Sequence, residues 1–274
     1  FTILAAPKLT VTGAFAKGSA WTSAYLGLSS FVTTAAGSNL GFALVGGVGQ
    51  LAAAAELTWT NVNTVSLRFS EPVNLPAVGA MTLLGVTNSA TAGGKGTQTV
   101  VTPSAVSLLE GGTVAQWTLP VSLASGKWQL LLADGAVTSA AGSRALDGEW
   151  TTSSSTFAAG SGDGTAGGAF VYRFNVLVGD VTGSSSTVDT SDVSAVKGSL
   201  GQAGSATNYR SNVNGDSTIN ATDQTLVTVE AGRTTLSSLG SYVPVLTPAA
   251  SATVDGPFTV TFPDDAVWRA AITG

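Results

Sequence analysis

The residues best suited to chemistry lie between Gly179 and Gly232, where the chain contains two related copies of an oxygen-rich loop. We call residues 180–192 the first loop and residues 212–223 the second loop. In the second loop, oxygen-bearing residues occupy positions 1, 3, 5, 7, 9 and 12, as calcium loops require. These residues are Asn212, Asn214, Asp216, Thr218 through its main-chain carbonyl, Asn220 and Asp223. The spacing predicts a Ca²⁺ site in the second loop.

The first loop is a weaker version of the same pattern. It keeps the acids Asp180, Asp189 and Asp192, but Thr182 and Ser184 occupy inner positions and the loop is one residue longer. An extra residue disturbs the spacing that brings the oxygens around one ion. We therefore predict that calcium binds the second loop in preference to the first, where the site is weakened or lost.

Both loops also have an interpretation without metal. Asp and Asn are ordinary turn residues, and each loop would then only cap the helix that follows it. Two such loops in tandem, each followed by an apolar-periodic segment, favour a calcium-loop origin. The charge of the second loop is low, with two carboxylates and Ser217 where a glycine normally eases the turn. Binding there is expected to be modest.

Composition limits the remaining chemistry. The chain of 274 residues has no Cys and no His, so it cannot supply a Ser-His-Asp or Cys-His nucleophile, a usual zinc site, a haem-ligating His or an iron–sulfur cluster. Eleven Lys and Arg against 16 Asp and Glu give a net charge of −5, which offers no basic field to a nucleic acid. The hard oxygen ligands that remain suit calcium.

Two further sets of residues have both a chemical and a structural interpretation. Asp147 and Glu149 lie on either side of one glycine, and paired acids occur in glycosidases, but the same pattern is typical of a turn. Trp59, Trp117 and Trp128 suggest a sugar-stacking surface, but on alternating strands they are expected in the core. We predict that the chain is not an enzyme; a carbohydrate-active enzyme is the opposing hypothesis.

The elements that must position these residues are mostly strands. Alternating apolar and polar residues begin at Leu9 and Val11 and return in several later segments separated by Gly-rich or polar turns. The later predicted strands are 57–59, 64–70, 80–84, 97–101, 114–119 and 127–132. This pattern predicts an antiparallel sandwich of two packed sheets. The polar, Gly-rich residues 151–168 are expected to have little to pack against.

Residues 19–31 predict a helix near the N-terminus. Trp21, Tyr25, Leu28 and Phe31 recur at intervals of four and three residues, with Ser19 as the expected N-cap. An aromatic stripe at this spacing is expected to be core.

Residues 18–55 carry no charge and must be weighed as a membrane span, which needs about 20 mostly apolar residues. Four glycines and Gln50 within residues 41–55 favour buried strands and turns instead, so we expect no membrane span.

Five short segments of the sequence carry a resemblance to a known domain type. The segments are residues 66–73, 146–150, 162–168, 172–176 and 179–181. Together they resemble the immunoglobulin-like module that precedes a dockerin-type repeat in very large exported bacterial surface proteins. The resemblance covers about residues 18–233, and it implies an extracellular, non-catalytic scaffold module.

The duplicated loops themselves are similar to dockerin, the loop-helix module that docks onto cohesin domains. In that family, the pair of residues just before the last loop acid contributes to partner recognition. The matching pairs here are Thr190 with Ser191, and Ala221 with Thr222. Because only the first pair keeps two hydroxyls, the resemblance implies at most one partner-binding face, at Thr190 and Ser191, for a cohesin-like domain.

Residues 244–274 resemble the opening third of an immunoglobulin-like repeat of some bacterial haemoglobin-receptor and surface proteins. Residues 258–262 alternate as a strand, and the haem implication fails because the chain has no His. The predicted fold is therefore mainly β with a small α module. We expect an immunoglobulin-like sandwich with an N-terminal strand and short helix at 1–178, a dockerin-like loop-helix repeat at 179–236, and a linker with an incomplete immunoglobulin-like repeat at 237–274.

These features predict a structural or adhesive module outside the cell. Assembly into a cell-surface layer or fibre, through other copies of the chain or other cell-surface proteins, is expected, with joints stiffened by calcium. The alternative is a dockerin-like appendage that attaches a separate activity to a cohesin-type scaffold. Because the chain begins at Phe1, it is expected to be processed or to be a piece of a longer protein.

Overall fold

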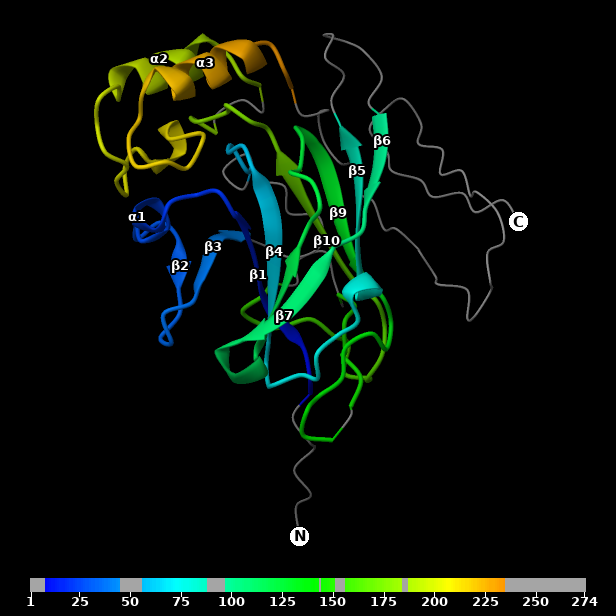
Figure 1. Ribbon diagram of the computed structural model, residues 1–274. Coiled ribbons are helices and arrows are strands. Elements are labelled where there is room, and N and C mark those ends of the chain that lie inside the picture. The colour runs from blue at the N-terminus through cyan, green and yellow to red at the C-terminus, as the bar shows by residue number, and fades with distance from the viewer. Residues whose placement is uncertain are drawn as a thin grey trace.

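Two antiparallel sheets face each other in the computed structural model, which describes residues 8–44, 56–87, 97–142, 144–150, 156–183 and 187–234 (Figure 1). The first sheet contains β1 (Val11–Gly18), β2 (Val32–Thr33), β3 (Asn39–Leu44), β4 (Val62–Phe69), β7 (Ala105–Leu109) and β8 (Val114–Thr118). The second contains β5 (Met81–Thr87), β6 (Thr97–Val101), β9 (Gly126–Leu132) and β10 (Phe170–Val176). Their spatial orders are β2-β3-β1-β4-β8-β7 and β10-β9-β5-β6. The predicted fold class is confirmed.

The alternation of the sequence decides which side chains enter the core. Val65, Leu67 and Phe69 of β4 are buried, as the predicted strand over 64–70 requires. Trp117 of β8 and Trp128 of β9 are buried as well, together with Trp59 just before β4. The prediction that the three tryptophans are core residues is confirmed.

Some strands were not evident from the sequence. The predicted set lacks β2, β3, β7 and β10, although β10 pairs with β9 over seven residues at the edge of the second sheet. Its residues Arg173 and Asn175 alternate with the core residues Tyr172 and Phe174, as in a strand with one polar face, yet both polar side chains are buried in the fold. The sequence pattern alone gives no reason to bury these polar side chains.

The N-terminal helix is shorter than the predicted one. Helix α1 spans only Ser23–Leu26 and is capped by Thr22, whose hydroxyl accepts a hydrogen bond from the Tyr25 amide at 3.2 Å, so Ser19 is not the cap. The helix ends at Gly27, and successive turns then carry the chain to Phe31. Trp21, Tyr25 and Phe31 are nevertheless buried, because the turns fold the chain back and bring the three rings into one aromatic cluster.

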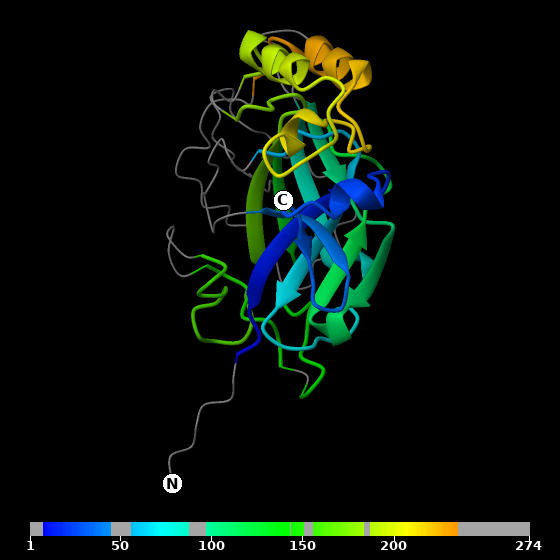
Figure 2. The same ribbon diagram turned by 90° about the vertical axis from the view of Figure 1, so that its left-hand side faces the viewer.

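A pair of helices lies side by side at one end of the sandwich (Figures 1 and 2). Helix α2 spans Thr190–Gly198 and follows the first loop, and helix α3 spans Ala221–Glu230 and follows the second. The prediction of a helix behind each loop is confirmed. The described residues also include short 3-10 helices η2 (Val78–Ala80), η3 (Glu110–Gly112) and η4 (Tyr209–Ser211).

The segment between α2 and α3 is packed against the sandwich and the N-terminal elements. Tyr209 stacks on Trp59, with ring centroids 5.9 Å apart, and on Phe42 of β3 at 6.4 Å. The Tyr25 hydroxyl donates to the Tyr209 carbonyl at 2.6 Å. Side chains from both parts belong to one continuous core cluster.

Backbone contacts reinforce this packing. The amides of Thr22 and Thr60 each donate at 2.9 Å to carbonyls of the second loop, those of Gly215 and Val213. Gly215 has a φ of 71°, and a Cβ there would lie 2.3 Å from the Trp21 ring, so only glycine fits this approach. We call this contact region, centred on Trp59 and Tyr209, the aromatic joint.

Several predictions fall on residues that the structure does not describe. The incomplete repeat expected at 237–274, with its strand at 258–262, lies outside the described residues. In the uncharged N-terminal stretch, residues 39–44 form β3, and residues 45–55 are also outside the description. None of the helices in the described ranges has the length and apolarity that crossing a bilayer requires.

Candidate functional site

Four of the predicted residues of the second loop form hydrogen bonds with Asp216. One carboxylate oxygen of Asp216, Oδ2, accepts hydrogen bonds from the side-chain amides of Asn214 at 2.9 Å and Asn220 at 3.2 Å. The other accepts from the Thr218 amide at 2.7 Å. Asn212 is buried, and its Oδ1 accepts from the Asp216 amide at 3.1 Å. The loop is thus closed by hydrogen bonds among the predicted ligands.

Asp223 connects the beginning of the second loop to the helix that ends it. Its Oδ1 accepts from the amides of Val213 at 2.7 Å and Asn214 at 3.2 Å, and its Oδ2 accepts from the amide of Asn220 at 2.9 Å. Asn220 is the N-cap of α3, and its side chain accepts from the Thr222 amide. Burial raises the pKa of the Asp223 carboxyl, while its three backbone hydrogen bonds act in the opposite direction.

The first loop uses its acids in separate ways. Asp189 is the N-cap of α2, and Asp192 accepts hydrogen bonds from the backbone and hydroxyl of Thr182 and from the Asp189 amide. Asp180 is fully buried and faces Glu56, which lies in the segment before β4, next to Leu57 and its bridge to Val176 of β10. Burial, with help from that contact, raises the pKa of Asp180 to about 7.

The acids of the first loop therefore do not converge as a metal-binding group. Among the described residues, the carboxylates of Asp180, Asp189 and Asp192 are not grouped within the 4.8 Å that one ion would span. Ser184 lies outside the described residues. Thr190 and Ser191 are exposed at the first turn of α2, and Ser191 donates through its amide and its hydroxyl to Asp189. A role for this pair in partner binding stays a prediction.

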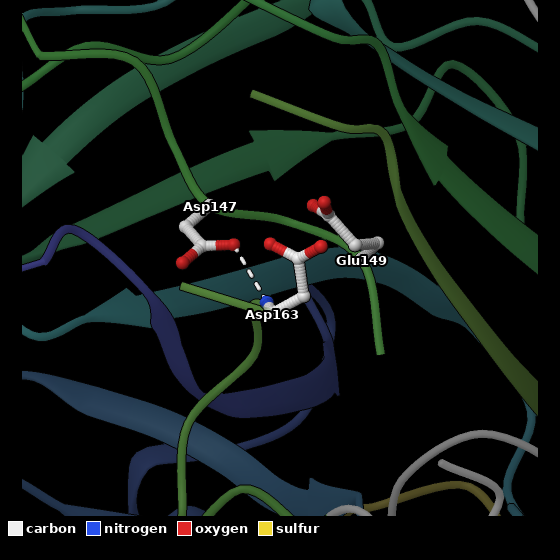
Figure 3. A group of neighbouring side chains, drawn as sticks. All are labelled: Asp147, Glu149 and Asp163. Atoms are coloured by element: carbon white, nitrogen blue, oxygen red, sulfur yellow. Dashed lines mark hydrogen bonds between the residues drawn. The ribbon is translucent and has the colours of Figure 1, made fainter. Parts of the chain in front are cut away.

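A group of acids elsewhere does converge. The carboxylates of Asp147, Glu149 and Asp163 point toward one another, and one oxygen from each lies within 4.8 Å of the others (Figure 3). Asp147 is buried, and its two oxygens accept from the amides of Asp163 and Gly164, both at 2.9 Å. The sequence indicated the first two acids only, because Asp163 is brought to them by the fold.

Asp163, the third acid of this group, comes from the Gly-rich segment 151–168, which the sequence predicts to have little to pack against. Gly162 has a φ of 97°, and a Cβ on it would lie 2.2 Å from the Asp147 carboxyl carbon. The Gly167 amide donates to the Leu146 carbonyl at 2.9 Å, which pairs the two segments. Glycines at these positions let the backbone approach the acids.

The acid group is electrostatically unfavourable when fully ionised. Burial raises the pKa of Glu149, and the charges of Asp147 and Asp163 raise it further. One oxygen from each acid could ligate a divalent cation, but the geometry selects no particular metal. Because the chain has no His and no Cys, any metal in this group would have only oxygen ligands from the protein.

We expect the variant Glu149→Gln to change the pH dependence of stability. A raised pKa means that the folded state favours the protonated form of Glu149. The stability that this preference gives to the folded state is fully present below the unfolded-state pKa, and it is lost as pH rises through the folded-state pKa. The variant should therefore become more stable than the unsubstituted chain as pH rises above the ordinary pKa of Glu, about 4.3. Urea unfolding without divalent ions checks this; a difference in unfolding free energy that does not vary with pH would contradict it.

Comparisons with known proteins give little beyond this geometry. No family model and no curated protein matches the chain. Two solved structures, the N-terminal part and domains 1–6 of the bacterial S-layer protein SbsC, are 16% identical to it. They align with 41% and 42% of this chain and with 21% and 12% of their own, at TM-scores of 0.24 and 0.23.

A third solved structure, PcoC, a methionine-rich copper resistance protein from Escherichia coli, is 14% identical. It aligns with 44% of this chain and 96% of its own, at a TM-score of 0.21. The chain thus spans about a fifth or less of the surface-layer chains it matches. TM-scores of this size carry no argument about function.

Proposed function

We propose that the chain is a non-catalytic structural or adhesive module outside the cell, whose sandwich and helical pair act as one mechanical unit. The observation that carries this proposal is the aromatic joint, in which Tyr209 of the interhelical segment packs on Trp59 and Phe42. Such packing resists relative motion of the two parts, as a module that transmits force requires. The weak similarity to surface-layer domains is compatible with this proposal and does not carry it.

Assembly is the expected activity of such a module, through other copies of the chain or other cell-surface proteins. Electron microscopy of the purified chain, with calcium and then with EDTA, tests this directly. We expect filaments or sheets in calcium and looser or fewer assemblies after chelation. Monomers that respond to neither treatment would contradict the proposal and leave the cohesin-binding appendage, acting through Thr190 and Ser191, as the alternative.

The calcium part of the proposal belongs to the second loop. Side-chain oxygens of Asn212, Asn214, Asp216, Asn220 and Asp223, with the Thr218 carbonyl, would hold the ion. The six residues offer only oxygen ligands, which suits calcium. The side-chain amides of Asn214 and Asn220 donate to Asp216 Oδ2 in the metal-free loop, so both would rotate to turn their oxygens to the ion. Calcium would supply a concentrated positive charge to this group.

We expect added calcium to raise the unfolding temperature of the chain and the variant Asp216→Asn to lose that increase. Binding to the folded state alone stabilises by about 2.7 kcal/mol at a hundredfold excess over Kd. Asp216→Asn keeps the volume of the side chain but removes one of the two carboxylates of the second loop. Calorimetric scans with Ca²⁺ and with EDTA measure the effect.

Two control variants locate the ion. Asp189→Asn alters the first loop and should keep the calcium-dependent increase, as should Glu149→Gln in the acid group. Loss of the increase in Glu149→Gln, with Asp216→Asn unaffected, would place the ion at Asp147, Glu149 and Asp163 instead. Absence of any increase in the unsubstituted chain would remove calcium from the proposal.

A further inference from the structure

A group of buried polar side chains lies on the second sheet, on the side opposite to the sandwich core. Trp128 of β9 and Phe174 of β10 point into the core, so their neighbours Lys127 and Asn175 point to the other face. Both are nevertheless buried, with exposed fractions of 2% and 6%, and Glu56 beside them is 1% exposed. Burial of a lysine at this level is uncommon unless a partner neutralises it.

The strand register places Lys127 and Asn175 directly against each other. They are Cα partners in the antiparallel pairing of β9 and β10. Side chains at such positions start from Cβ atoms about 4.5–5.5 Å apart and share one face. The next pair along, Gln129 and Arg173, makes a side-chain hydrogen bond at 3.4 Å.

Lys127 and Asn175 leave two buried atoms unsatisfied. Neither the Lys127 ammonium nitrogen, Nζ, nor the Asn175 side-chain carbonyl oxygen, Oδ1, has a hydrogen-bond partner. The Asn175 amide nitrogen, Nδ2, is engaged, and donates to Glu56 Oε1 at 2.9 Å. The Leu57 amide donates to the Asn175 carbonyl at 3.0 Å, so the backbone holds Glu56 beside this residue.

The surroundings make the uncharged, nucleophilic form of the lysine easier to reach than in an exposed lysine. Burial lowers the pKa of Lys127 to about 8, although the charge of Glu56 opposes the change. An amine of this kind is a nucleophile, and the side-chain amide carbon of Asn175 is the electrophile facing it across the strands. The carboxylate of Glu56 already contacts the nitrogen that would have to leave.

We propose that Lys127 and Asn175 join in an intramolecular amide bond, with Glu56 carrying the proton. The uncharged Nζ of Lys127 attacks Cγ of Asn175, forming the Nζ–Cγ bond. A proton passes from Nζ to Glu56 and from Glu56 to Nδ2, the Cγ–Nδ2 bond breaks, and ammonia leaves. No electrons are exchanged with an external reagent, and Glu56 returns to its starting state. The product removes an unpaired buried ammonium group, whose burial is costly.

This bond would tie β9 covalently to β10, the strand from which the chain continues to the first loop and α2. The second sheet could then not separate at this pairing under load or denaturant. The inference is independent of calcium and of assembly, because neither contributes an atom to the reaction.

Intact-mass spectrometry of the denatured full chain tests the proposal. We expect the unsubstituted chain to be one ammonia lighter than its sequence requires. Lys127→Met and Glu56→Gln should each have the full sequence mass. Lys17→Met is the matched control, a partly buried strand lysine whose Nζ donates to the Asn39 carbonyl at 2.7 Å, and it should keep the loss.

Peptide mapping separates this bond from another source of the same mass change. Asn214 precedes Gly215, and ring closure at an Asn-Gly sequence also releases ammonia. A branched peptide that joins Lys127 to Asn175, with no tryptic cleavage after Lys127, supports the proposal. Full mass in the unsubstituted chain, or a loss that maps to Asn214, overturns it. Complete bond formation in Glu56→Gln would overturn the role given to Glu56.

Discussion

Replacement of Trp59 by alanine is expected to lower the free energy of unfolding by about 3–5 kcal/mol, the range for deletion of a large buried aromatic ring. Trp59 has no exposed surface. Its ring lies 5.5 Å from Trp21, 5.1 Å from Phe42 and 5.9 Å from Tyr209, so three segments distant in sequence lose a shared partner at once. The cavity cannot close without moving the aromatic joint.

Chemical denaturation followed by circular dichroism measures this effect without relying on tryptophan fluorescence. Trp59→Phe keeps part of the ring contacts and should lose less stability than Trp59→Ala. Val229→Ala, on the exposed side of α3, is the surface control and should change the free energy by less than about 0.5 kcal/mol. If Trp59→Ala matched that control, the aromatic joint would not be a structural contact.

Asp223→Ala is expected to lower the free energy of unfolding by about 3 kcal/mol or more, with or without calcium. The substitution removes the acceptor of three backbone amides, those of Val213, Asn214 and Asn220. Each buried donor left unsatisfied costs about 1–3 kcal/mol. Because burial also raises the pKa of Asp223, the carboxylate itself is costly to bury, and the net loss should lie toward the lower end of the summed range.

The measurement is urea unfolding in EDTA, so that any effect of metal is excluded. Asp223→Asn retains one acceptor oxygen and should lose less stability than Asp223→Ala. Asp216→Asn, in the same loop but with a half-buried side chain, should lose the least in EDTA. An Asp223→Ala variant as stable as the unsubstituted chain in EDTA would mean that this acid serves only a metal.

The aspartate at the end of each loop thus has a structural role that does not require calcium. Asp192 and Asp223 each complete a capping box, in which the helix N-cap and the third helical residue bond reciprocally. The metal-free interpretation of the loops is therefore compatible with the hydrogen bonds, and calcium binding at the second loop remains a prediction. The stability of Asp223→Ala in EDTA and the calcium response of Asp216→Asn separate the two contributions.

Features that depend on neighbours along the chain were determined by the sequence alone. Alternation at Val65, Leu67 and Phe69 predicts β4 because a strand turns every second side chain to the same face. The spacing of Asn212, Asn214 and Asp216 likewise predicts one loop, because a short turn keeps such residues close. The helices behind both loops follow from the same local patterns, since a capping residue precedes each apolar-periodic segment.

The limits of that reasoning appear where several local structures have similar energies. The stripe from Trp21 to Phe31 suits a helix, but Gly27 and the following serines end α1 after four residues. Packing of the rings decided the outcome, because Trp21 and Phe31 touch, with ring centroids 5.8 Å apart, only when the chain folds back between them.

Only the tertiary structure decided which distant residues meet. Strand register sets Lys127 opposite Asn175, whereas the packing of loops and turns brings Tyr209 to Trp59 and Asp163 to Asp147. Local spacing contains no information on these pairs, since each depends on how the whole chain crosses the two sheets. Periodicity therefore determined the elements and the second loop, whereas long-range pairing determined the aromatic joint, the acid group and the buried lysine with its asparagine.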